Sequence, residues 1–405
     1  MKARRTVPFS PGSLPFDMRG AIFGAALVSS SIALTHCAGE TPPAATAPAA
    51  SPSSSVAPAP AVTASVAAEP IDAGPPPASA PSTPTEPPHL ASRSVAVPGV
   101  TAPLSFDYLA ADRERGRVYL AVGNTGSLDV FDVAGGAFTR VDGFKTAERE
   151  VRGKKRMMGP SAATVGDGVV YVGDRATNEV CAVDAKALKL GKCVKLPTPT
   201  DGVAYVASTK EIWVTTPGDQ SLTVLDASHA DAPKPKTVIK LGGDVEGFAI
   251  DEAHGLFFTN TEDKGTTLAV DLKTHKLRST WSPGCGADGP RGVAVDTRRS
   301  LLFVACTDHV QVLDEAHDGA PLGKLDTGAG VDNLDYVEAS GLLFVGAGKA
   351  ARLTVARFDD KGNPSVVATG ETAQGARNAV ADGSGSAYVP DPANASLLIL
   401  GPLPK

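Results

Sequence analysis

The sequence predicts an all-β fold built from a repeated unit of short strands. Gly289–Asp314 is the clearest unit, because two apolar runs and one alternating run are separated by polar turns. The same pattern returns along the chain at intervals of about 40–45 residues, which is typical of a propeller or a solenoid. We count seven units between residues 106 and 400 and predict a seven-bladed β-propeller.

Each unit has the order strand a, turn, strand b, loop, strand c, and units one to six also have a fourth strand. The units begin at Phe106, Ser161, Gly202, Gly247, Gly289, Asn333 and Asn378. Unit seven stops after Leu400 without a fourth strand. Ser92–Val97 is a strand without a unit of its own, so we expect it to complete blade seven. Closure of the ring removes exposed strand edges.

The chain before the repeats reads as an export signal followed by a tether. Arg19–Cys37 has a positive start and an apolar core, so residues 1–37 are predicted to be a signal peptide, with Met18 as an alternative start. Leu34–Cys37 resembles a bacterial lipobox, which predicts lipidation of Cys37. Ordinary cleavage or an uncut anchor are the alternatives. Residues 38–89 are rich in Ala, Pro and Ser and are predicted to be a disordered linker, leaving 90–405 for the propeller.

The remaining cysteines predict two disulfides in the repeat region. Cys181 and Cys193 fall on strands c and d of one hairpin, and Cys285 and Cys306 fall on the same face of the ring. Such pairs require an oxidising compartment, so we expect an envelope lipoprotein facing the periplasm, or a secreted protein. No cysteine pair or histidine set has the spacing of metal ligands, and no metal or cofactor is predicted. The mild net charge of −6 gives no reason to expect a nucleic-acid partner.

Three stretches carry a family resemblance: Val169–Asp184, Ile212–Asp226 and Leu256–Asp271. They resemble the YVTN-type repeat of YncE-like seven-bladed propellers, and Phe258-Thr259-Asn260 is the nearest match to its signature phrase. The resemblance covers roughly Leu90–Leu403. It implies the fold and leaves the function open, because this type of repeat is structural.

One set of polar residues converges on the ring axis. The residue just before each strand a should line the mouth of the central channel, which gives Ser161, Asp201, Glu246, Arg291, Asp332 and Arg377, followed by Asn333 and Asn378. We match Asp107 of blade one to Asp335 of blade six. This mixture suits a small polar or anionic ligand or a peptide end. The alternative is that these groups pair with one another. The aspartates that follow strands a and c are interpreted as turn residues.

A second irregular feature is Thr146–Pro160, which is inserted between blades one and two. By topology it lies over the same face as the channel mouth. It is locally basic and also carries Met157-Met158; its basic residues are Arg149, Arg152, Lys154, Lys155 and Arg156. Long loops on rigid scaffolds often bind ligands, and a solvated surface loop is the alternative.

The sequence therefore predicts a monomeric, lipid-anchored envelope propeller that binds a ligand or a protein partner and touches the membrane through its anchor only. The alternative is a lactonase-like hydrolase with a divalent metal at the mouth, held by Asp201, Glu246, Asn333 and Asn378. Arg291 and Arg377 would place positive charge beside that metal, and seven blades fit the six-bladed metal family badly. A quinone-dependent dehydrogenase needs many stacked tryptophans, and the chain has Trp213 and Trp281 alone.

Overall fold

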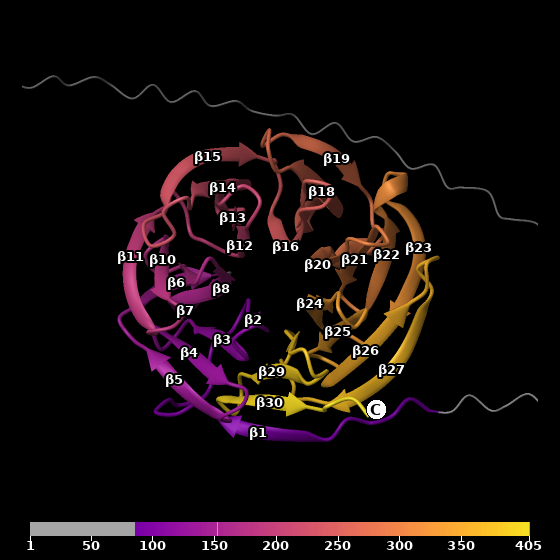
Figure 1. Cartoon of the computed structure of the whole chain (residues 1–405), viewed down its shortest axis with the longest axis horizontal. Coiled ribbons are helices and arrows are strands. Elements are labelled where there is room, and N and C mark those ends of the chain that lie inside the picture. The colour runs from indigo at the N-terminus through magenta and orange to yellow at the C-terminus, as the bar shows by residue number, and fades with distance from the viewer. Residues whose placement is uncertain (1–85, 152, 405) are drawn as a thin grey trace, which may run out of the picture. The chain divides into compact units, whose positions relative to one another are not determined.

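A computed structural model describes residues 86–151 and 153–404 of the chain. These residues form seven four-stranded antiparallel sheets arranged in a ring (Figure 1), which confirms the predicted seven-bladed propeller. Cys37, the signal segment and the linker up to residue 85 lie outside the described residues.

The blades follow one another along the chain, with strand a innermost. Blade one is formed by β2 (Ala110–Asp112), β3 (Arg117–Val122), β4 (Ser127–Asp132) and β5 (Ala137–Val141). Blade two is formed by β8 (Pro160–Gly166), β9 (Val169–Asp174), β10 (Glu179–Asp184) and β11 (Lys189–Lys195). Blade three is formed by β12 (Val203–Val206), β13 (Glu211–Thr216), β14 (Ser221–Asp226) and β15 (Lys234–Lys240).

The second half of the ring repeats this order. Blade four is formed by β16 (Val245–Asp251), β17 (Leu256–Thr261), β18 (Thr266–Asp271) and β19 (Leu277–Trp281). Blade five is formed by β20 (Pro290–Asp296), β21 (Leu301–Cys306), β22 (His309–Asp314) and β23 (Ala320–Asp326). Blade six is formed by β24 (Val331–Val337), β25 (Leu342–Ala347), β26 (Arg352–Phe358) and β27 (Pro364–Glu371). Short 3-10 turns lie at Pro217–Asp219, Glu262–Lys264, Gly286–Asp288 and Glu315–His317.

Blade seven is completed by the N-terminal strand, as predicted. Its own strands are β28 (Val380–Ala381), β29 (Ala387–Asp391) and β30 (Ser396–Leu400), and β1 (Ser92–Ala96) pairs with β30 in antiparallel register. In Figure 1 the indigo β1 lies beside the yellow β30. The preceding segment also reaches blade six, because Leu90 N donates to Thr369 O at 2.7 Å and Thr369 N donates to Pro88 O at 3.0 Å.

The second strand of each blade carries the core. Trp213 of β13 and Phe303 of β21 are fully buried, and each packs against the next blade: Trp213 stacks on Phe257 at a centroid distance of 4.8 Å. Both faces of these strands are covered by neighbouring blades, so the strands read as apolar runs rather than as alternating patterns. Each buried large side chain stabilises the ring by about 1.5–3 kcal/mol.

The blade turns use aspartate as predicted. Asp184 Oδ1 accepts hydrogen bonds from the backbone of Lys186 at 2.8 Å and of Ala187 at 2.6 Å, and Asp271 does the same for Thr274. Aspartate side chains favour tight turns because they bond the backbone just ahead of them.

Both predicted disulfides are present. Cys181 and Cys193 lie directly opposite each other on β10 and β11, and Cys285 is joined to Cys306 at the end of β21. The two bonds are consistent with an extracellular or envelope compartment. Among the described residues, no helix is long and apolar enough to cross a membrane.

The insertion between blades one and two is not an irregular loop. It forms a hairpin of β6 (Ala147–Val151) and β7 (Lys154–Met158), which pair in antiparallel register. Lys155 Nζ lies 2.9 Å from Glu148 Oε1 across the two strands. The prediction of a loop was wrong because the hairpin has no buried apolar face of its own, so its sequence lacks the alternation that marks a half-buried strand.

Candidate binding site at the channel mouth

Strand pairing fixes which residues occupy equivalent places around the axis. Ala110 lies opposite Tyr119, the third residue of β3, and Asp335 lies opposite Phe344, the third residue of β25. Ala110 and Asp335 are therefore equivalent. Asp107 is therefore equivalent to Asp332. The match of Asp107 to Asp335 was wrong because blade one has a shorter strand a, which hides the register in the sequence. Asp335 lies deeper, where its Oδ2 accepts from Ala381 N at 2.7 Å.

Two levels of residues follow from this alignment. The outer level, called here the mouth ring, consists of Asp107, Ser161, Asp201, Glu246, Arg291, Asp332 and Arg377. The next level inward, called the second ring, consists of Tyr108, Ala162, Gly202, Gly247, Gly292, Asn333 and Asn378. All the residues predicted to line the mouth belong to these two rings.

The arginines of the mouth are engaged in ion pairs. Arg377 Nε lies 3.1 Å from Asp332 Oδ2, and its Nη2 lies 3.6 Å from Asp107 Oδ1. Arg175 bridges Asp107, at 2.6 Å, and Asp201. Sequence reasoning missed Arg175, although it directly follows β9, whose end lies on the mouth face. The second strand of each blade therefore offers a second set of candidates on this face.

Arg291 forms its ion pair with a residue outside the mouth ring. Its Nη2 lies 2.9 Å from Oε1 of Glu262, in the turn that follows β17 of the preceding blade. Both side chains keep about a quarter of their surface exposed. The structure thus joins Arg377 to the carboxylates of the mouth ring, while Arg291 pairs at its rim.

Tyr108 crosses the channel from blade one. Its hydroxyl lies 3.2 Å from Asp201 Oδ2 and 3.5 Å from Glu246 Oε1, and it accepts a hydrogen bond from Gly247 N at 3.0 Å. Its ring stacks on Phe248 at a centroid distance of 5.7 Å. Sequence reasoning missed this residue as well, although it is the one aromatic side chain of the second ring.

Glycine in the second ring permits this close packing. Gly247 has a φ of +66°, and a Cβ placed there would lie 2.5 Å from the carbonyl oxygen of Arg291. A larger residue would therefore force the innermost strands of blades four and five apart.

Carboxyl groups outnumber the cations that pair with them at the mouth. Burial, together with the charges of Asp201, Asp332 and Asp107, raises the pKa of Glu246 well above its usual value. Burial raises the pKa of Asp332 to about 6, although Arg377 acts against this shift. Burial also raises the pKa of Asp201, against the effect of Arg175. Glu246 is the carboxyl group of the mouth ring that pairs with a neutral group, the Tyr108 hydroxyl, instead of with a guanidinium.

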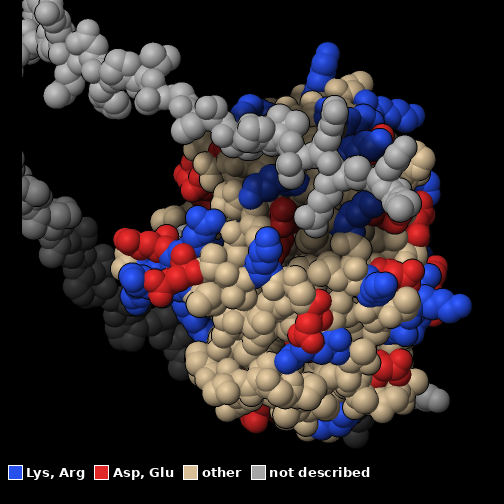
Figure 2. All heavy atoms as spheres, turned by 90° about the vertical axis from the view of Figure 1, so that its left-hand side faces the viewer, with Lys and Arg blue, Asp and Glu red and all other residues tan. Residues whose placement is uncertain are grey.

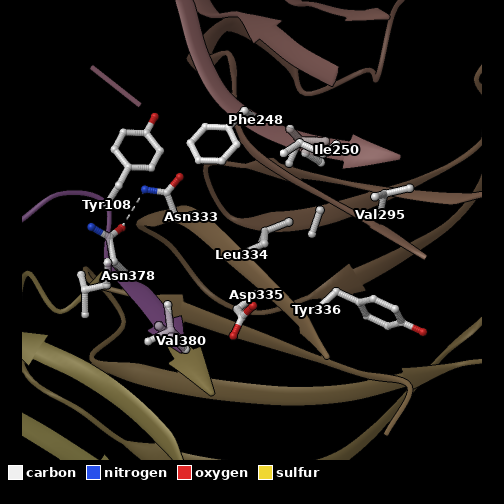
Figure 3. Close-up of a pocket in the computed structure, with 16 residues that line it drawn as sticks. Tyr108, Phe248, Ile250, Val295, Asn333, Leu334, Asp335, Tyr336, Asn378 and Val380 are labelled. Atoms are coloured by element: carbon white, nitrogen blue, oxygen red, sulfur yellow. Dashed lines mark hydrogen bonds between the residues drawn. The ribbon is translucent and has the colours of Figure 1, made fainter. Parts of the chain in front are cut away.

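An inner cavity of about 310 Å³ lies beyond the second ring (Figure 3). Tyr108, Asn333 and Asn378 stand at its polar end, where Asn333 Nδ2 donates to Asn378 Oδ1 at 3.3 Å. Its other walls combine the apolar side chains of Phe248, Ile250, Val293, Val295, Leu334 and Val380 with the polar side chains of Asp335 and Tyr336. Asn378 Nδ2 in turn donates to the backbone oxygen of Asp107 at 2.5 Å, so the two amides are held by groups of the ring itself.

A larger groove of about 510 Å³ lies outside the mouth ring, between it and the hairpin β6–β7. Four charged residues line it: Asp107, Arg156, Arg175 and Arg377. Its apolar lining comes from Leu104, Phe106, Val151, Met157, Met158 and two prolines. On the side of the ring near β10 and β11, by contrast, acidic and basic side chains are interspersed around an uncharged area (Figure 2). The groove is thus a place where apolar surface and guanidinium groups meet.

No protein-family model and no curated protein matches this sequence. Solved structures of the same shape are numerous. One is a chain of a mitotic checkpoint complex, with 12% identity, a TM-score of 0.59, and coverage of 84% of this chain and 99% of that one. A second is U3-55K, with 11% identity, a TM-score of 0.62, and coverage of 78% and 99%. A third is virginiamycin B lyase from Staphylococcus aureus, with 11% identity, a TM-score of 0.59, and coverage of 77% and 99%. Identities this low show the fold alone.

Proposed function

We propose that the chain is a cell-envelope propeller, anchored by a lipid on Cys37, that binds a polypeptide segment of a partner protein. The observation that carries the proposal is the groove between the hairpin β6–β7 and the mouth ring. Rings of this fold commonly present binding surfaces on one face of a rigid scaffold. One of the similar structures is a mitotic checkpoint complex, so a ring of this shape is a component of a complex there.

The lining of the groove defines the segment that fits it. Arg156 is exposed, and the side chain of Arg377 keeps 45% of its surface exposed despite its pair with Asp332. Guanidinium groups bind carboxylates through charge-assisted hydrogen bonds. Met157 and Met158 offer flexible apolar surface beside them, which adapts to different side chains. The segment we propose carries a carboxylate, either a chain end or an acidic side chain, next to an apolar residue.

The envelope location rests on the disulfides and on the sequence. Cys181–Cys193 and Cys285–Cys306 favour an oxidising compartment, while Cys37 lies outside the described residues. Growth with radiolabelled palmitate should label the wild-type protein and leave Cys37→Ser unlabelled. Label that persists in Cys37→Ser, or no label in either protein, would exclude this anchor.

The geometry gives less support to the alternative of a metal-dependent hydrolase at the mouth. Asp201 already contacts Arg175 and the Tyr108 hydroxyl, and Asn378 already donates to the backbone of Asp107. A divalent cation bound by these groups would have to displace a guanidinium from a buried carboxylate, which is costly.

A peptide library with free C-termini, screened against the purified propeller, tests the proposed groove. We expect selected peptides to combine a carboxylate with an adjacent apolar residue, and the double substitution Arg156→Ala/Met157→Ser to weaken their binding about tenfold or more. Both residues are exposed, so the melting temperature should hardly change. Arg291→Ala is the matched control, because Arg291 belongs to the mouth ring and does not line the groove. Selected peptides that bind the double variant with unchanged affinity would contradict the proposal.

A further inference from the structure

A second cluster of chemically active side chains lies on the face opposite the mouth, at the junction of blades four and five. Asp251 ends the innermost strand of blade four, His254 stands in the following turn, and Glu315 begins the turn after β22 of blade five. His254 Nδ1 lies 2.8 Å from Asp251 Oδ2 and 3.4 Å from Glu315 Oε1. One ligand atom from each of the three residues lies within 4.8 Å of the other two.

The neighbouring junction shows what is unusual about this cluster. Between blades five and six, the aspartate equivalent to Asp251 is Asp296, and the equivalent of His254 is Arg299. Arg299 pairs with Asp296 at 2.6 Å and also donates to the backbone oxygen of Phe358 in the next blade. A guanidinium thus neutralises that junction. Between blades four and five the shorter imidazole takes its place, and a second carboxyl group, Glu315, faces it.

Glu315 is buried without adequate partners. Its side chain is 5% exposed, and within the described part of the chain its Oε2 has no hydrogen-bond partner. Leaving a buried carboxyl oxygen unpaired costs free energy, so an unpaired oxygen of this kind indicates that an ion or another ligand binds beside it. Glu315 and His254 both line a cavity of about 350 Å³, together with Arg278, Ser279 and Trp281. The cavity gives a ligand access to the cluster.

We propose that Asp251, His254 and Glu315 bind a divalent transition metal such as Zn²⁺. Two ligand atoms about 2.1 Å from a tetrahedral zinc lie about 3.4 Å apart, which is the separation of His254 Nδ1 and Glu315 Oε1. His254 Nδ1 and Asp251 Oδ2 lie 2.8 Å apart in a hydrogen bond, so zinc would replace the proton between them and these two atoms would move apart. The donors are one imidazole and two carboxylates, a set that suits zinc or manganese better than calcium. Three protein ligands would leave a further coordination position for water or an anion, and the cavity lined by His254 and Glu315 gives such a molecule access.

Zinc binding to the full chain, first stripped with a chelator, tests this site. Titration calorimetry with ZnCl₂ should show one saturable equivalent, and Co²⁺ should give the visible absorption of a low-coordinate site. Glu315→Gln keeps the shape of the side chain and should weaken binding about tenfold or more, and so should His254→Ala. Should His254→Ala fail to fold, His254→Gln replaces it.

His317→Ala is the matched control. His317 forms the same type of pair, with its Nδ1 2.8 Å from Asp314 Oδ2 at the same sequence spacing, and its side chain is 78% exposed. This variant should bind zinc like the wild type. The proposal is overturned if the wild type shows no saturable binding, if Glu315→Gln keeps wild-type affinity, or if His317→Ala loses as much affinity as His254→Ala.

Discussion

The hydroxyl of Tyr108 lies 3.2 Å from Oδ2 of Asp201, although 93 residues separate them in the chain. This contact joins blade one to blade three across the axis, and the bond from Gly247 N adds blade four. Contacts in a propeller run mainly between successive blades, so a side chain that reaches non-adjacent blades limits how far they can shift relative to one another. The mouth ring is therefore positioned by a buried polar network as well as by the strands.

Tyr108→Phe should destabilise the ring by about 1–3 kcal/mol, because it leaves Gly247 N without its buried acceptor and removes one of the hydrogen bonds to Asp201, which keeps its pair with Arg175. Tyr171→Phe is the matched control. Tyr171 is fully buried, and its hydroxyl has no hydrogen-bond partner among the described residues. Chemical denaturation of both variants measures the difference. Equal losses would mean that the hydrogen bonds of the Tyr108 hydroxyl contribute nothing to stability.

Glu246→Gln should make the domain more stable at pH 8 than the wild type. The pKa of Glu246 is raised in the folded state, so the unfolded chain releases its proton at lower pH than the folded chain does. Stability from this group is therefore lost as pH rises through the interval between the two values, and the loss is complete above the folded pKa. The advantage of the variant should disappear near pH 4, where both states are protonated. Denaturation curves from pH 4 to 8 measure it, and a constant difference would contradict the assignment.

The two arginines of the mouth ring should differ in their contribution to stability. The side chain of Asp332 is only 4% exposed, and Arg377→Ala removes the cation that pairs with it. The loss should lower the free energy of unfolding by roughly 1–3 kcal/mol at pH 8. The cost should shrink at pH 5, because Asp332 has a pKa of about 6 and is then mostly protonated. Arg291→Ala breaks a partly exposed pair and should cost less than about 1 kcal/mol. Thermal melting at both pH values separates the two, and equal effects would reject the assigned pairing.

Closure of blade seven predicts a sharp boundary for truncation. Removing residues through Pro98 deletes β1 and exposes the edge of β30, and should lower the melting temperature strongly. Removing residues through Pro87 keeps β1 and the bonds of Leu90 to Thr369, and should leave melting nearly unchanged. Differential scanning calorimetry of the two proteins decides between them. The same melting temperature for both would show that β1 adds little to the ring.

The sequence predicted the ring because each blade repeats the same local signals. Apolar second strands and turn aspartates such as Asp184 are set by neighbours within one blade, and the missing fourth strand of unit seven indicated the closure. Contacts between blades were harder to predict. Three such residues have partners in other blades: Arg175, Tyr108 and Glu315. The repeat predicts the position of their backbone in the blade but not how far their side chains extend. The ion pair of Arg291 was not predicted for the same reason, since its partner Glu262 comes from the preceding blade, and contact of Arg291 with a ligand stays a prediction.

The pairing of β1 with β30 also determines when, during synthesis, the ring can close. Ser92–Ala96 leaves the ribosome long before Ser396–Leu400 is made, so the first strand of the ring waits for the last. Sheet pairings between such distant segments form late, because the long loop between them must close first. A chain that terminates early would present β29 and β1 with unpaired edges, which attract aggregation and proteolysis. The pairing of the closing strand thus means that a full-length chain hides its strand edges, whereas a truncated chain exposes them to proteases.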